Sequence, residues 1–203
     1  MAKTTTKGAT NVPMTKIGEV ARLLRLPPGV RDEKIQKGGK KVKVISIVDL
    51  PEAGYIESVK DAITLSKDKF SSIKKYKIEP FDVLMSIQGT VGRVGIVPEG
   101  LSGDIIANIS LLAFRFKEDK ASNAVALLQY LKSSAGSKLI SKLQKGSTIK
   151  RINVKELAAS KIPELTADIK KLSKAVFDKE VAVLDKIKGL YDSLADIRKS
   201  YLS

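Results

Sequence analysis

The sequence of 203 residues contains no cysteine and no histidine. Without cysteine it can form neither a disulfide framework nor a thiolate metal site. Without histidine it lacks the commonest general base, the commonest metal ligand and any Ser-His or Cys-His catalytic pair. No stretch approaches the roughly 18 apolar residues of a membrane span. The residues 1–12 also lack the apolar core of a secretory signal. We therefore expect a cytoplasmic protein that binds no metal, cofactor or membrane.

Motifs typical of enzymes are also missing. A phosphate-binding loop of the form G-x-x-x-x-G-K-[ST] is absent. Adenine methylation at nitrogen would need an Asn/Asp-Pro-Pro-aromatic loop, whereas Pro27-Pro28 is followed by Gly29. Asp82 and Asp104 lie in β-like stretches, but no second acid and lysine accompany either of them. We therefore predict a non-catalytic protein, with an enzyme built on an unfamiliar carboxylate site as an alternative.

Positive charge is in excess, and it is unevenly distributed. The net charge is +15. Residues 166–203 hold 8 basic and 6 acidic side chains, a net of +2, so residues 1–165 carry the remaining +13. A strongly basic segment attracts phosphate polyanions, although a lysine-rich surface can also serve solubility alone. The charge therefore favours nucleic-acid binding by the first 165 residues.

Residues 14–165 have the pattern of an α+β domain, preceded by a flexible leader over residues 1–13. Alternating β-branched residues predict strands, and apolar residues at helical spacing predict helices. The predicted strands cover 42–48, 76–78, 82–87, 94–97, 105–109, 110–116 and 149–154. The predicted helices cover 14–26, 124–132, 139–143 and a turn at 154–157.

Three segments carry the candidate DNA contacts. Residues 88–93 read as a tight glycine turn between two strands, because the spacing G-x-x-G-x-x-G followed by β-like residues does not fit a dinucleotide-binding loop. Residues 146–151 combine small hydroxyl residues with two adjacent cations, which suits a phosphate contact as well as a solvated turn. Residues 31–43 read as a basic loop. The candidate side chains are Arg31, Lys40, Lys41, Gln88, Thr90, Arg93, Lys145, Ser147, Thr148, Lys150 and Arg151.

Residues 166–203 predict one long helix with a coiled-coil pattern. Ten positions from 169 to 201 alternate in steps of four and three, and eight of them are apolar. Ser173 and Glu180 interrupt this pattern. A helix of this length extends about 54 Å at 1.5 Å per residue, which is too long to pack entirely on one domain. The alternative is a terminal helix packed on its own domain. The predicted dimerisation residues are Ile169, Val176, Val183, Ile187, Leu190, Leu194, Ile197 and Tyr201.

Four segments in a fixed order, followed by this helix, give the chain a family resemblance. They are Lys16–Val20, Asp82–Pro98, Leu128–Ser133 and Gly146–Ile152, the last leading to Lys161–Pro163. Over about residues 14–203 the chain resembles the DNA specificity subunit of type I restriction-modification systems. The family's junction between domain and helix often has a proline-rich stretch followed by Glu-Gln, whereas residues 162–166 here read Ile-Pro-Glu-Leu-Thr.

The resemblance implies an architecture and a set of partners. Family members usually carry two target recognition domains, each followed by a long helix, and the two helices pair antiparallel. Each domain reads one half of a split DNA target, and the helices set the spacing and seat the methyltransferase subunits, which connect to a restriction subunit. One domain and one helix resemble half of such a subunit, so a homodimer would rebuild the whole and read a palindromic target.

Two further classes of protein fit the same sequence. A scaffold protein could use the basic face to bind an acidic partner protein. An RNA-binding module would need aromatic side chains clustered on a sheet for base stacking, and aromatic residues make up only 5% of the chain. Selection of a bipartite sequence from random duplex DNA would separate DNA recognition from both alternatives.

Overall fold

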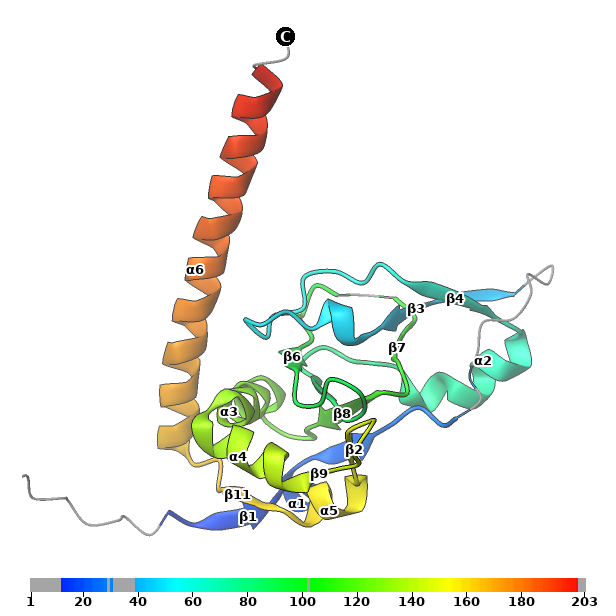
Figure 1. Cartoon of the computed structure of the whole chain (residues 1–203), viewed down its shortest axis with the longest axis vertical. Helices are drawn as coiled ribbons and strands as arrows, with labels where there is room; N and C mark the ends of the chain where they lie inside the picture. Colours follow the sequence, from blue (N-terminus) through cyan, green and yellow to red (C-terminus); the bar gives the residue numbers. More distant parts are fainter. Residues whose placement is uncertain (1–11, 29, 31–38, 102, 201–203) are drawn as a thin grey trace, which may run out of the picture.

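The computed structural model describes residues 12–28, 30, 39–101 and 103–200. A four-stranded sheet, a three-stranded sheet, two two-stranded sheets and several helices form a domain from which one long helix projects (Figure 1). The first sheet has the order β2-β8-β5-β6 and is antiparallel throughout. Its strands are β2 (Arg22–Leu24), β8 (Leu111–Arg115), β5 (Val83–Ser86) and β6 (Val94–Ile96).

The second sheet contains β4 (Ala62–Leu65), β3 (Lys40–Ile45) and β7 (Ile105–Ala107) in that order. Its central strand β3 is antiparallel to β4 and parallel to β7. Apolar residues of both sheets, such as Ile45 and Leu84, share one buried cluster, so the sheets pack on each other. The helix α2 (Lys67–Ile73) contributes Phe70 and Ile73 to a second cluster with Val42 of β3.

A third buried cluster joins the first sheet to helices. Val83 and Met85 of β5 pack there with α3 (Lys120–Lys132) and with Ile140 of α4 (Ser134–Leu143). Short elements complete the domain. These are β1 (Met14–Lys16), α1 (Ile17–Val20), η1 (Ile47–Asp49), η2 (Lys74–Tyr76), β9 (Gln144–Lys145), β10 (Arg151–Ile152), α5 (Val154–Ala159) and β11 (Lys161–Pro163).

The structure confirms the predicted hairpin of β5 and β6 and the predicted helices in the region of α3 to α5. The predicted helix over residues 14–26 is wrong, because only Ile17–Val20 is helical. β1 on one side of it pairs with β11, and β2 on the other side pairs with β8. The end of the predicted basic loop is also wrong, since residues 40–43 belong to β3. Sequence patterns did not reveal β4 or α2.

The long helix α6 (Ala167–Ser200) has two unlike halves. In the first half, Ser173 is buried and Phe177 packs against the cluster that contains α3. Leu184 is the last half-buried residue, and residues 185–198 are all exposed. The prediction that the helix is too long to pack entirely on its domain is confirmed. No helix in the described part of the chain is both long and apolar enough to cross a membrane.

One buried ion pair fixes the end of the first sheet. Asp82, which directly precedes β5, is 1% exposed and receives hydrogen bonds from Nε and Nη2 of Arg115 in β8, at 2.9 and 2.6 Å. Arg115 also donates to Glu79 and to the carbonyl oxygen of Lys77, each at 2.6 Å. Burial raises the pKa of the Asp82 carboxyl, and the hydrogen bonds from Arg115 oppose that shift. The pair thus ties the segment before β5 to β8.

We predict that Arg115→Ala destabilises the domain by about 3 kcal/mol, because it leaves the carboxylate of Asp82 buried without its partner. Urea unfolding at neutral pH measures the loss. Lys16→Ala removes an exposed ion pair with Glu19 and should change stability by less than about 0.5 kcal/mol. Equal stability of the two variants would contradict a structural role for the buried pair.

Candidate nucleic-acid interface

The structure brings two of the three predicted DNA-contact segments together. Gln88, in the turn between β5 and β6, forms an antiparallel bridge with Arg151 of β10. The amide of Gly89 donates to the carbonyl oxygen of Lys150 at 3.0 Å. The amide of Ile152 donates to the carbonyl oxygen of Ile87 at 2.9 Å. The turn at residues 88–93 and the loop at residues 146–151 therefore form one surface, which we call the double-loop surface.

The turn is held in place by a buried hydroxyl group. Ser86, which is fully buried at the end of β5, accepts a hydrogen bond from the amide of Arg93 at 2.9 Å and donates to the carbonyl oxygen of Thr90 at 2.6 Å. Gly89 and Gly92 have φ angles of 78° and 93°, as the sequence predicts for a tight glycine turn. A Cβ on Gly92 would also lie 3.1 Å from Ile140 of α4. The turn is thus a fixed platform for its side chains.

Most of the predicted side chains of the double-loop surface are accessible. Gln88 is half-buried, and the others are exposed: Thr90, Arg93, Lys145, Ser147, Thr148, Lys150 and Arg151. Lys145 is bound to Glu156 of α5 at 2.6 Å, so part of its charge is already neutralised. Sequence analysis did not select Lys138 and Lys142, which are exposed on α4, the helix whose Ile140 lies against the turn. Their spacing of four residues places both on one helical face, and that spacing was the available signal.

The third predicted segment lies elsewhere in the domain. β3 lies far from β9 and the double-loop surface in Figure 1. Lys40 binds Asp104 at 2.8 Å, and Lys77 binds the same carboxylate at 2.6 Å. The hydrogen bond from Lys40, followed by that from Lys77, lowers the pKa of Asp104. Lys41 is exposed on β3, and Arg31 lies outside the described residues. Lys40 therefore already has an acidic partner within the domain.

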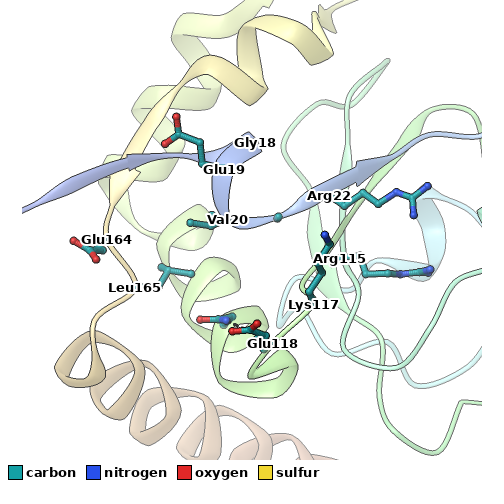
Figure 2. A pocket seen from close by; sticks show the side chains of 11 residues that line it. Gly18, Glu19, Val20, Arg22, Arg115, Lys117, Glu118, Glu164 and Leu165 are labelled. Carbon is teal, nitrogen blue, oxygen red and sulfur yellow. Dashed lines mark hydrogen bonds between the residues drawn. The ribbon is translucent and has the colours of Figure 1, made fainter.

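A hollow between the first sheet and the linker before α6 has a mixed electrostatic character. It encloses about 670 Å³ between the β1–β2 segment, the end of β8, α3 and the linker before α6. Figure 2 shows Arg22 and Lys117 at its border together with the carboxylates of Glu19, Glu118 and Glu164. Charges of both signs suit a polyanion less well than the double-loop surface does.

The carboxylates considered for catalysis are both engaged in ion pairs. Asp82 is held by Arg115 and Asp104 by two lysines, in different sheets. In the part of the chain that the structure describes, no three acidic residues gather in a group that could hold a metal ion. The double-loop surface itself presents hydrogen-bond donors and cations on a backbone that Ser86 and the bridge between Gln88 and Arg151 hold in place.

The fold has relatives among solved structures, although their sequences differ strongly. The chain is similar to the S subunit of a type I restriction-modification system from M. genitalium (16% identity, TM-score 0.50) and to the HsdS subunit from Thermoanaerobacter tengcongensis (16% identity, TM-score 0.53). A chain from a structural study of type I R-M complex assembly and conformational transition gives 16% identity and a TM-score of 0.56. These matches cover 93–96% of this chain but only 42–45% of theirs.

A search of curated proteins found no match. A family model described as the type I restriction modification DNA specificity domain matches residues 11–164. The matched segment contains both loops of the double-loop surface and ends just before α6. Together with the fold, this match shows that the chain belongs to the type I restriction-modification DNA specificity domain family.

Proposed function

We propose that the chain is one recognition domain and one helix of a specificity subunit, and that it reads one half of a split duplex DNA target. In this proposal, residues 14–165 form the recognition domain, and residues 166–203 pair with a second copy and seat methyltransferase subunits. Those subunits in turn connect to a restriction subunit, and the chain itself catalyses no step. A two-fold axis between two copies makes the target palindromic.

The observation that carries the proposal is the joining of the two loops into the double-loop surface. Exposed cations and hydroxyl groups there stand on a backbone that is fixed by Ser86 and by the bridge between Gln88 and Arg151. Lysine, arginine and hydroxyl side chains supply the phosphate contacts that position a protein on duplex DNA. Gln88 and Arg93 are also of the types that read base edges. A fixed backbone favours a defined register on the DNA.

Pairing is proposed for the exposed stripe of α6. Ile169 and Ser173 lie beside α3, since both border a groove with Tyr130 and Gln129. The outward apolar side chains are 41–67% exposed, which is a large apolar surface for one helix. They are Val176, Val183, Ile187, Leu190, Leu194 and Ile197. The predicted contact Tyr201 lies outside the described residues.

A groove beside α6 continues this stripe toward the domain. It has a volume of about 390 Å³ and is lined by Ala53, Val176, Val183 and Leu184 together with the charged residues Lys179 and Glu180. A second copy is the proposed occupant, because the distal half of the same helix offers the apolar side chains that such a groove would cover. The charges of residues 166–203 are nearly balanced, which reduces repulsion between two copies.

We expect the double variant Arg93→Ala/Arg151→Ala to bind duplex DNA more weakly and with a shallower salt dependence. Each lost phosphate contact should reduce the slope of log affinity against log salt by about 0.9. Fluorescence anisotropy at several salt concentrations gives this slope. Lys188→Ala/Arg198→Ala removes the same charge from the distal half of α6 and serves as the control. Equal slopes for the two double variants would contradict the assignment of the double-loop surface.

We expect a chain that ends after Leu184 to remain folded and to become monomeric, because it keeps Phe177 in the core but lacks the distal stripe. Sedimentation velocity measures the mass, and circular dichroism measures the melting temperature. A chain that ends after Leu165 should also be monomeric but should melt at a lower temperature, since it exposes the face of α3. A dimer formed by the chain ending after Leu184 would contradict pairing through the distal half.

A further inference from the structure

A polar cluster fastens α6 to the recognition domain at one position. Both carboxylate oxygens of Glu180 are used, one by Nζ of Lys132 at 2.8 Å and the other by the side-chain amide of Gln129 at 2.7 Å. Lys132 also donates to the carbonyl oxygen of Ala53 at 2.9 Å. Lys132 and Glu180 are only 19% and 33% exposed. Three elements, α3, α6 and the segment 51–56, therefore meet at this cluster, which we call the helix clamp.

The helix clamp is continuous with the backbone that carries the double-loop surface. Next to Ala53, Gly54 accepts a hydrogen bond from the amide of Ile96 in β6 at 2.8 Å. Tyr55 forms a bridge with Ile96, and its ring lies 6.2 Å from that of Phe177 in α6. Because β6 follows directly on the turn at residues 88–93, α6 and the turn are parts of one connected body.

Beyond the helix clamp, α6 extends away from the domain, so a change in its angle displaces its tip. Residues 185–198 are exposed and project away from the domain (Figure 1). At 1.5 Å per residue these fourteen residues span about 21 Å. A tilt of about 10° at the clamp would move the tip by about 4 Å, close to the roughly 3.4 Å rise of one base pair. A small change in the angle of α6 to the domain would thus displace its tip by about the length of one base-pair step.

We infer that Glu180, Lys132 and Gln129 set the angle between the recognition domain and the distal half of α6, and thereby the spacer length between two half-sites. These are positioning residues, since none of them belongs to the double-loop surface. The inference rests on the proposed pairing through α6. It assigns a role to Glu180, which otherwise interrupts the apolar heptad pattern at a cost in pairing stability.

The same helix provides a matched control. Lys174 and Asp178 form an ion pair at 2.6 Å within α6, and their side chains are 68% and 57% exposed. This pair links one turn of α6 to the next, and both of its members belong to α6. Asp178→Ala and Glu180→Ala therefore each remove one carboxylate and one ion pair from α6, but only Glu180→Ala releases the helix clamp.

The angle between the recognition domain and the distal half of α6 can be followed with spin labels. The chain has no cysteine, so labels attach only where a cysteine is introduced. With spin labels on Ser71→Cys in α2 and Lys188→Cys in α6, pulsed EPR measures the distance between the recognition domain and the distal half of α6. Dilution with unlabelled protein suppresses distances between copies. We expect Glu180→Ala and Lys132→Ala to broaden the distance distribution by about twofold, and the double variant to add little because the two residues act as a unit.

A narrow distribution in Glu180→Ala, or an equal broadening in Asp178→Ala, would overturn the inference. Melting temperatures of all variants identify any loss of fold. This experiment needs neither DNA nor dimerisation, so it decides the role of the clamp even if the proposed function fails.

The functional measurement is the range of spacer lengths among duplexes selected from a random pool. We expect wild-type chain and Asp178→Ala to prefer one spacer. In Glu180→Ala the enrichment of that spacer over its neighbours should fall by about fivefold, the low end of usual coupling between sites. The preferred half-site sequence and its affinity should not change. Loss of half-site affinity together with an unchanged spacer would contradict a positioning role. No enrichment by the wild-type chain would instead count against the proposed function.

Discussion

The buried strand β5 is the constraint on which the rest of the domain depends. Its residues alternate between two apolar clusters, one beneath α3 and one between the two sheets. Asp82, directly before it, is bound to β8 through Arg115, and Ser86 at its end holds the turn at residues 88–93. Exclusion of water from both faces leaves the strand little freedom to shift register. The turn is therefore placed as firmly as the core itself.

The same strand connects the candidate DNA surface to the long helix. α3 packs on one face of the first sheet, and α6 packs on α3. The excess positive charge lies in residues 1–165, whereas the exposed apolar stripe lies on α6. The proposed contacts with a polyanion and with a second protein surface are thus separated along the chain but joined through one packed core. This separation is what a subunit that measures distance along DNA requires.

Local sequence patterns were sufficient to predict the hairpin that carries the turn and the long helix. The β-branched residues around Gly89 and Gly92 predicted the hairpin of β5 and β6, and the heptad pattern predicted α6. Local spacing failed at residues 14–26, where pairing of β1 with β11 and of β2 with β8 outweighed a helical apolar pattern. Such pairing depends on segments that are distant in sequence.

The candidate site shows the same limit. Both loops could be chosen from their glycine, hydroxyl and basic residues, but the bridge between Gln88 and Arg151 depends on the tertiary fold. Lys40 looked like a DNA contact because nothing nearby in sequence revealed its partner Asp104. Glu180 interrupts the heptad pattern, and its partner Lys132 could not be predicted because it lies 48 residues away in sequence, on α3.

The most direct test of the account is selection of duplexes by the full chain from a pool of random sequence at moderate salt. The account predicts enrichment of two short inverted half-sites, separated by a spacer of fixed length and unspecified sequence. Absence of any enriched sequence, together with measurable binding to the pool, would contradict it and would leave only non-specific attraction to polyanions.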